Sequence, residues 1–513
     1  MQPLHLIRGA WLTVVFLAFL RPALAADESD AKPNEALVSL QTWLSNHVAQ
    51  PHLGAAALGV KVISLKTGNV IFDYHGNQLL KPASNAKLFT GALALDRLGP
   101  DYRIKTSLYA AVQPAADGTL AGDLIVYGRG DPSFAARFHD GDYSKTLTPL
   151  IEALIATGIK QINGDLVGDE SFFHGPPLGD GWAWDDLQEY YGAEVSALSI
   201  QDNVIDLVFK PAAELGKPCQ IITKPATDYK TFVNRTITVT NGGKRSITLY
   251  RPLGENTVYV HGSLPLDSAE QIEAVAVHRP ALWFVTLFKQ ELTKRGIIVT
   301  GKIRSVNWLD RESAPVDYAE LVEIAVVESR PLSEILGKMM KPSQNLYAQL
   351  LLLQVGATRK PQPATPNTET AGLTELNKWL GEIGVRRGEV FLQEGSGLSR
   401  TALLTPHATV NLLRHMASHR HADIFRDTLP LAGVDGTLRA RLKGTPAEMN
   451  VRAKTGTLGF VNTISGYVTT AAKEPLAFSI MLNNYSAPEG KPSGRAEVDA
   501  LVALLAGIRD RLE

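Results

Sequence analysis

Ser84 and Lys87 are the first pair of residues whose types and spacing would support chemistry. A serine hydroxyl is not ionised at neutral pH, so it becomes a nucleophile only when a nearby base takes its proton. The stretch Ser84-Asn-Ala-Lys87 opens a segment in which Leu88, Leu95 and Leu98 recur at helical spacing. Residues three apart on a helix share one face, which would bring the Lys87 amine to the Ser84 hydroxyl. The spacing therefore predicts a nucleophile and its base at the start of a helix.

Two later motifs, Ser343-Gln344-Asn345 and Lys454-Thr455-Gly456, complete the pattern of a serine–lysine acyl-transfer site. Each of the three motifs is short and has a second copy in the chain, at Ser29-Asp-Ala-Lys32, Ser305-Val-Asn307 and Lys66-Thr-Gly68. Order and context select among the copies. Ser343 follows a break between two helical patterns, and Lys454 ends a late β-type run, where an edge strand would line a groove. Loops held by rigid elements commonly present catalytic side chains.

The three motifs in this order resemble those of the serine penicillin-recognising acyltransferases. Within that family, the chain is similar to the class C low-molecular-mass penicillin-binding proteins, which act as D-alanyl-D-alanine carboxypeptidases and endopeptidases. The long separation between Ser84 and Ser343 favours this class, because a compact β-lactamase has no insertion of that size there. The chain departs from the family pattern at Gly459, where some members have serine, and at Glu394, where aspartate is usual. Further matching segments lie at 130–132, 168–172, 182–186, 196–199, 395–400, 433–438 and 465–467.

The resemblance implies catalytic roles for four residues. Ser84 would attack the carbonyl between two D-alanines, releasing the terminal one and leaving an acyl-enzyme that water hydrolyses. Lys87 would accept the serine proton, provided that burial and the nearby charge of Lys454 keep its amine neutral. Ser343 would pass the proton toward the leaving nitrogen, and Asn345 would hold Lys87 and the substrate amide in place.

The resemblance also implies a set of substrate-binding residues: Lys454, Thr455, Gly456, Thr457, Asp169 and Arg400. Lys454, Thr455 and Thr457 would hold the terminal carboxylate, and the backbone N–H groups of Ser84 and Thr457 would form the oxyanion hole. Asp169 and Arg400 would bind the far end of the peptide side chain, which in many cell walls is a diaminopimelyl group with both charges. A structural salt bridge or solvated surface charges remain the alternative for these two residues.

The implied partners are peptidoglycan stem peptides as substrates and β-lactam antibiotics as covalent inhibitors, without a cofactor, a metal or nucleic acid. His415 and His419 have the spacing of a zinc helix, but a methionine stands where a metalloprotease has its glutamate. Two other functions stay open: a serine β-lactamase and a non-catalytic wall-binding scaffold. Glu375 matches the deacylating glutamate of class A β-lactamases only faintly, which argues against the first. The paired nucleophile and base argue against the second.

These side chains need a scaffold that unites both ends of the chain. A hairpin at 58–74 and a helix that ends at Leu98 would pack with late strands and a final helix near 498–512. The expected fold class is α/β (α+β), an αβα sandwich of the transpeptidase and β-lactamase type. The catalytic domain would be discontinuous, formed by 26–100 and 325–513. We expect 101–324 to be an insertion of two small mostly-β domains, with the nested one at about 128–195.

The composition agrees with an exported globular protein. The chain has 513 residues, 45% hydrophobic content and 51 Lys+Arg against 52 Asp+Glu, which excludes disorder and a polycationic nucleic-acid binder. Its one cysteine, Cys219, cannot form an internal disulfide. Residues 1–25 have the layout of a cleaved secretory signal, with Arg8, an apolar run from Ala10 to Leu20 and a small-residue end. The run is far shorter than the roughly 20 residues of a membrane-spanning helix. We therefore expect a periplasmic or secreted protein without a membrane span after cleavage, and an uncleaved anchor stays the alternative.

Overall fold

The structure is a computed structural model that describes residues 34–358 and 367–512. The predicted signal segment, 1–25, lies outside the described residues. Within the described ranges, no helix combines the length and the apolar character needed to cross a membrane.

A five-stranded antiparallel sheet joins the two ends of the chain, in the order β19-β20-β21-β1-β2. The N-terminal hairpin lies against the C-terminal strands because β1 pairs with β21 along its whole length, with Val60 opposite Ile480. Seven of the eight β1 residues are buried, as expected of a continuous apolar strand covered on both faces. The strands are β1 (Ala57–Ser64), β2 (Val70–Tyr74), β19 (Arg452–Leu458), β20 (Val461–Thr469) and β21 (Pro475–Asn483).

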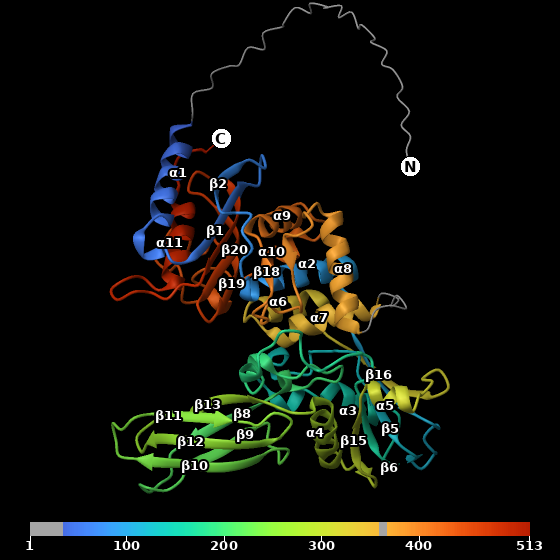
Figure 1. The fold of residues 1–513 in the computed structure, drawn as a ribbon. Coiled ribbons are helices and arrows are strands. Elements are labelled where there is room, and N and C mark those ends of the chain that lie inside the picture. The colour runs from blue at the N-terminus through green and yellow to red at the C-terminus, as the bar shows by residue number, and fades with distance from the viewer. Residues whose placement is uncertain (1–33, 359–366, 513) are drawn as a thin grey trace, which may run out of the picture.

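Helices cover both faces of this sheet (Figure 1). One face is covered by α1 (Glu35–Val48) and α11 (Gly494–Gly507), whose buried residues share a hydrophobic cluster with the strands. A second cluster fills the other face beneath six helices and the small β17–β18 hairpin. The predicted αβα fold class is confirmed. The elements of the second face are α2 (Ala86–Leu98), α6 (Leu332–Met340), α7 (Asn345–Thr358), α8 (Thr368–Glu382), β17 (Val390–Phe391), β18 (Leu403–Leu404), α9 (Pro406–Ala417) and α10 (Ala422–Thr428).

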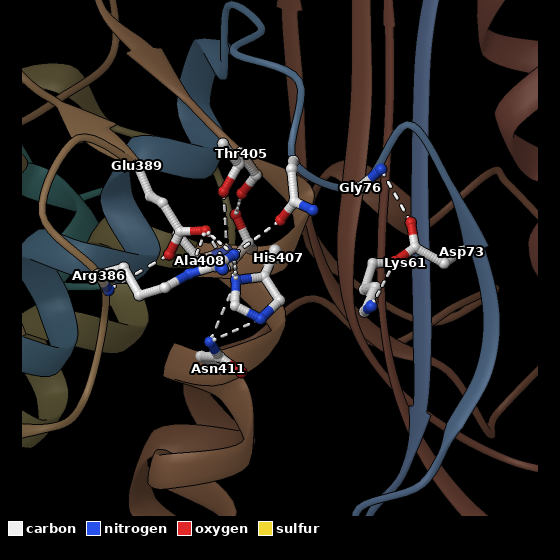
Figure 2. Close-up of polar contacts among 11 residues, drawn as sticks. Lys61, Asp73, Gly76, Arg386, Glu389, Thr405, His407, Ala408 and Asn411 are labelled. Carbon is white, nitrogen blue, oxygen red and sulfur yellow. Dashed lines mark hydrogen bonds and ion pairs between the residues drawn. The ribbon is translucent and has the colours of Figure 1, made fainter. Parts of the chain in front are cut away.

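The segment between β2 and the predicted nucleophile is held at several points. Figure 2 shows Asp73 accepting a hydrogen bond from the Gly76 N–H at 2.9 Å and pairing with Lys61 at 2.5 Å. The carbonyl of Gly76 accepts from the N–H of His407 at 2.9 Å, at the start of α9. Nearby, the side chain of Asn483 accepts from the Lys81 N–H at 2.7 Å. Contacts with a helix and with β21 thus fix the path of the chain toward Ser84.

The insertion begins with β3 and ends with β16, which pair with each other in a mixed five-stranded sheet of order β15-β7-β5-β3-β16. A smaller sheet, β14-β6-β4, is part of the same unit. Buried residues of both sheets pack against α3 and α4 in a third hydrophobic cluster. The elements are β3 (Lys105–Ala110), β4 (Thr119–Ala121), β5 (Leu124–Tyr127), α3 (Thr148–Ile155), β6 (Gln161–Asn163), β7 (Leu166–Asp169), α4 (Pro280–Lys294), β14 (Ile298–Val299), β15 (Ile303–Val306), α5 (Trp308–Ser313) and β16 (Val322–Glu328).

The strands between β7 and α4 pair only with one another among the described residues, in the sheets β13-β8-β9 and β10-β12-β11. Cys219 is buried beside them. The segment 128–195 does not form a unit of this kind, because β6 and β7 pair with strands on both sides of it. The strands of 204–276 thus pair as a separate group, whereas those of 128–195 do not, and the division into domains stays a prediction. The strands are β8 (Val204–Lys210), β9 (Gln220–Lys224), β10 (Thr231–Val239), β11 (Ser246–Tyr250), β12 (Thr257–Pro265) and β13 (Gln271–Ala276).

Candidate active site

Ser84 lies in a single 3₁₀ turn, Ala83–Asn85, directly before α2. Its Oγ accepts a hydrogen bond from the Nζ of Lys87 at 2.9 Å, the contact expected from their spacing along one helical turn. Ala83 has a positive φ of 47°, a conformation that costs a non-glycine residue roughly 1–2 kcal/mol. The side chain of Asn85 anchors the turn to the sheet by donating to Ser465 Oγ at 2.7 Å. The nucleophile is thus held by the sheet on one side and by the helix on the other.

Lys87 is fully buried and has three oxygen neighbours. Besides Ser84, its Nζ lies 2.5 Å from Asn345 Oδ1 and 2.7 Å from the carbonyl oxygen of Ser396. Burial lowers the pKa of Lys87 from 10.5 to about 7, because the charged amine loses its hydration, and the negative charge of Glu394 partly opposes this shift. About half of the amine is therefore neutral near pH 7, as a base for Ser84 requires.

The buried Lys454 and the half-buried Ser343 form a second pair. The Nζ of Lys454 donates to Ser343 Oγ at 2.8 Å and to the carbonyl of Thr455 at 2.7 Å. Burial, followed by repulsion from Lys87, lowers the pKa of Lys454 well below its usual value. Repulsion between the two lysines thus lowers the pKa of Lys454, whereas the sequence led us to expect that it would lower the pKa of Lys87. Ser343 has a positive φ of 66°, so the backbone of this loop is strained where it meets Lys454.

The edge strand β19 runs close to the nucleophile turn. A Cβ on Gly456 would lie 2.3 Å from Thr463 Oγ1 and 2.7 Å from the Pro82 carbonyl oxygen, so only glycine fits there. Thr455 and Thr457 alternate with Gly456 along the strand and both face the cleft. Lys454 is fully buried and does not line the cleft. The geometry therefore leaves Thr455 and Thr457 to contact a substrate carboxylate directly, with Lys454 behind them.

Ser84 opens into a cleft of about 390 Å³. The wall facing β19 comes from the loop that carries Ser343, from the start of α7 and from the insertion. The Nδ2 of Asn345 donates to the carbonyl of Tyr191 at 2.8 Å, so the insertion touches a predicted catalytic residue. The lining residues are Ser84, Asp186, Tyr190, Tyr191, Pro342, Ser343, Asn345, Gly397, Leu398, Arg400, Thr437, Thr455, Thr457, Leu458 and Gly459.

The structure does not bring Asp169 and Arg400 together. Arg400 lines the cleft, but the carboxylate that it binds is that of Asp186, with Nη2 3.2 Å from Oδ1. Asp169 ends β7, is fully buried and accepts from Arg311 Nε at 2.6 Å and from the hydroxyl of Tyr318. Asp169 is absent from the cleft lining because its carboxylate is already neutralised inside the insertion. Asp169 thus forms a structural salt bridge, with Arg311, which is the alternative considered for it in the sequence analysis.

Asp186 and Thr437 are among the cleft residues with polar side chains that had no role in the sequence prediction. Asp186 ends the matching segment 182–186 and is only 5% exposed where it binds Arg400. Thr437 belongs to the matching segment 433–438, and its Oγ1 accepts from Thr455 Oγ1 at 2.7 Å. Both segments were recognised as similar to the family, but nothing in their spacing distinguished these two side chains from their neighbours.

A buried carboxylate holds the loop that contacts Lys87. Glu394 is 1% exposed and accepts the backbone N–H of Ser396 at 2.6 Å and that of Gly397 at 2.5 Å. The N–H of the preceding Gly395 donates to Gln349 Oε1, and its carbonyl accepts from Thr90 Oγ1, each at 2.7 Å. Glu394 thereby orients the Ser396 carbonyl toward Lys87 and supplies a negative charge that raises the pKa of the amine.

Replacing Glu394 with glutamine is expected to lower the rate of acylation by penicillin about tenfold, since an amide NH₂ cannot accept the Ser396 N–H. It should also move the acidic limb of the pH–rate profile to lower pH, because the charge that raises the pKa of Lys87 is lost. Glu394→Asp keeps the charge, so the acidic limb of its pH–rate profile should lie at nearly the same pH as that of the native protein. Stopped-flow acylation across pH 5–9 measures both effects, and a Glu394→Gln profile that coincides with that of Glu394→Asp would contradict the role.

Comparison with known proteins identifies the family. The model of the D-Ala-D-Ala carboxypeptidase 3 (S13) family matches residues 40–506. A D-alanyl-D-alanine carboxypeptidase from Actinomadura sp. (strain R39) is 35% identical over 91% of this chain and 84% of its own length. The crystal structure of penicillin binding protein 4 (dacB) from Haemophilus influenzae superposes with a TM-score of 0.74 at 28% identity, covering 90% of this chain and 97% of that one. A second structure of that protein, complexed with a β-lactam, has a TM-score of 0.69 at 26% identity and covers 89% and 97%. The resemblance predicted from the motifs is confirmed: the chain belongs to the D-Ala-D-Ala carboxypeptidase 3 (S13) family.

Proposed function

We propose that this protein is a serine peptidase that cleaves D-Ala-D-Ala ends and D-Ala-diaminopimelate cross-links of peptidoglycan through an acyl-enzyme on Ser84. The observation that carries the proposal is the contact between Ser84 Oγ and the buried amine of Lys87 at 2.9 Å, with the pKa of that amine lowered to about 7. A nucleophile and a neutral base in one cleft are the requirements of acyl transfer.

The residues of the cleft account for each step of the reaction. Lys87 takes the proton of Ser84 as Oγ attacks the carbonyl carbon, and backbone N–H groups of Ser84 and Thr457 stabilise the oxyanion. The C–N bond then breaks, and the proton reaches the leaving nitrogen by way of Ser343, which the buried Lys454 holds at 2.8 Å. Water hydrolyses the ester with the same groups acting in reverse.

β-Lactam antibiotics are expected to acylate the same serine. Their ring amide presents a carbonyl to the nucleophile and a carboxylate to Thr455 and Thr457, as the D-Ala-D-Ala end does. The leaving nitrogen stays attached to the acyl group after the ring opens, so it blocks the path of water. The relative from Haemophilus influenzae has been solved in complex with a β-lactam, which supports this inhibitor class.

The pair Arg400–Asp186 is proposed to bind the zwitterionic side-chain end of the substrate. Arg400 is 42% exposed in the cleft and Asp186 is beneath it, so a ligand carboxylate can reach the guanidinium while an ammonium reaches the acid. This assigns to Asp186 the role that the sequence prediction gave to Asp169.

Replacing Arg400 with alanine should lower kcat/KM about tenfold for a peptide whose side chain ends in both charges, because a charge-assisted hydrogen bond is lost. A peptide with an acetylated, uncharged side chain should be cleaved at an unchanged rate. Release of D-alanine measures both rates. Equal losses for the two peptides would contradict the assignment to the side chain.

We also propose that the protein acts outside the cytoplasm. The predicted signal at 1–25 and a polymer substrate of the cell wall both support an exported protein that acts in the periplasm or at the wall. Immunoblotting of periplasmic and cytoplasmic fractions tests this, with N-terminal sequencing of the exported form to locate the cleavage site.

A β-lactamase is the alternative that the cleft argues against. None of the described residues that line it is a glutamate, and Glu375 instead accepts from Arg97 Nε at 2.7 Å. Among the described residues that line the cleft, the one carboxylate is that of Asp186, which Arg400 binds, so it is not free to activate water for rapid deacylation. Incubation with a synthetic peptide ending in D-Ala-D-Ala and with nitrocefin separates the two functions. Release of D-alanine with a stable penicilloyl-enzyme supports the peptidase, and rapid nitrocefin turnover would overturn it.

A further inference from the structure

A second cavity of about 380 Å³ adjoins the catalytic cleft. The two cavities share Tyr190, and the second is lined by Gln344, the residue between Ser343 and Asn345. The remaining walls come from the insertion, including Arg137, Asp202 and Asp206. This cavity, the side pocket, thus lies directly beside the motif that contacts the leaving group.

The side pocket offers a ligand both a hydrogen-bond acceptor and a hydrogen-bond donor. Asp206 accepts a hydrogen bond from the Tyr143 hydroxyl and forms no ion pair with any residue that the structure describes. Gln344 is 4% exposed, and its Oε1 accepts the Leu346 N–H at 3.3 Å. Its Nε2 donates to none of the described residues. Among the described residues, a carboxylate without an ion pair and an amide N–H without an acceptor thus line one cavity, which suits a peptide, whose backbone carries both N–H and carbonyl groups.

The floor of the side pocket is rigid and strained. Gln201, Asp202 and Asn203 have consecutive positive φ values of 50°, 56° and 56°, a conformation that persists only where the surroundings enforce it. Asp202 is fixed by Arg137 Nε at 2.9 Å and by the hydroxyl of Tyr347 at 2.6 Å. Tyr347 lies on α7, the helix that begins at Asn345, so the pocket floor and the catalytic motif share one support.

We propose that the side pocket binds the leaving half of a cross-linked substrate, a second stem peptide, with Asp206 accepting a backbone amide N–H of that peptide and Gln344 donating to a carbonyl or carboxylate. The inference rests on the proposed function and deepens it. When a cross-link is cut, the amide C–N bond breaks, the acyl group passes to Ser84 Oγ, and the second peptide leaves as an amine that has gained the proton. A terminal D-alanine is too small to extend beyond the cleft, so the pocket distinguishes endopeptidase from carboxypeptidase substrates.

The raised pKa of Asp206 supports this role. Burial raises it, because the carboxylate loses hydration, and the nearby charge of Asp202 adds to the effect against the opposing hydrogen bond from Tyr143 and the charge of Arg137. A peptide N–H that donates to this carboxylate would replace part of the hydration that burial removes.

The test compares two substrates on the full-length protein. Asp206→Asn should lower kcat/KM for a purified cross-linked muropeptide dimer roughly ten- to hundredfold, the effect of losing a charge-assisted hydrogen bond. Release of D-alanine from a monomeric pentapeptide and labelling by fluorescent penicillin should not change. Ala274→Phe, on the strand opposite Asp206, should have the same selective effect by filling the pocket. Asp267→Asn, an exposed change in the same unit, is the matched control.

The outcomes separate this inference from the proposed function. A selective loss of dimer cleavage in both pocket variants supports the side pocket. Equal losses on both substrates, no loss on either, or a native protein that trims pentapeptides but leaves the dimer intact would each overturn it. A native protein that neither releases D-alanine nor becomes labelled would instead overturn the proposed function.

Discussion

Ser84→Ala is expected to abolish covalent labelling by a fluorescent penicillin and to lower D-alanine release by at least about four orders of magnitude, as loss of a nucleophile does in other serine hydrolases. Ser84 Oγ is the cleft hydroxyl that contacts Lys87, at 2.9 Å. The neighbouring hydroxyl of Ser343 is bound to Lys454 instead.

The control for this variant comes from the chain itself. Ser305→Ala removes the serine of the decoy motif, whose Oγ accepts from Arg279 inside the insertion, and should leave labelling unchanged. The melting temperature of Ser84→Ala should remain close to that of the native protein, because the substitution creates only a small cavity. Undiminished labelling of a folded Ser84→Ala variant would show that the acyl group is carried elsewhere.

The acylation rate is expected to rise with pH through about 7 and to level off above it, because Lys87 must be neutral and its pKa lies at about 7. Below that pH the amine holds its proton and cannot accept the one from Ser84. Lys87→Arg should lower the rate at least about a thousandfold at every pH, since a guanidinium remains protonated throughout. Stopped-flow measurement of penicillin acylation gives both the pH dependence of the native protein and the lower rate of the variant.

A control is needed because removal of a buried lysine also changes stability. With its pKa lower in the folded state than in the unfolded one, Lys87 binds fewer protons when folded between about pH 7 and 10.5, so unfolding becomes more costly as pH rises through this window. Lys87→Met should remove the share of this dependence that Lys87 contributes and remain folded while losing acylation. A profile that is flat from pH 6 to 9 in the native protein would show that a different group sets the rate.

Local spacing was sufficient to predict the central pair of the site. Ser84 and Lys87 are one helical turn apart, so any helix beginning there brings them together. Ser343, Asn345 and Lys454 are hundreds of positions away, and neither periodicity nor propensity can place such residues in one cleft. Their prediction depended on the family resemblance, and the structure brings all of them within hydrogen-bond contact of the central pair or of one another.

Sequence alone could not predict which of two possible partners a side chain contacts. Two acidic residues, Asp169 and Asp186, lie in matching segments, and which one reaches Arg400 depends on the irregular path between them, which has no hydrophobic period to interpret. The division into domains depends on strand pairing for a related reason. An alternating pattern predicts a strand but not its neighbour, and β6 and β7 find parallel partners more than a hundred residues later in the chain.

The pairing of β1 with β21 determines when the protein can become an enzyme. A ribosome releases the N-terminal strand first, yet its neighbour in the sheet includes Ile480, so the central sheet closes only after nearly the whole chain has been made. Lys87 meets Asn345 and Ser396 equally late. Until then its amine is hydrated, protonated and unable to assist Ser84. The nascent chain is therefore inactive until nearly all of it has been made.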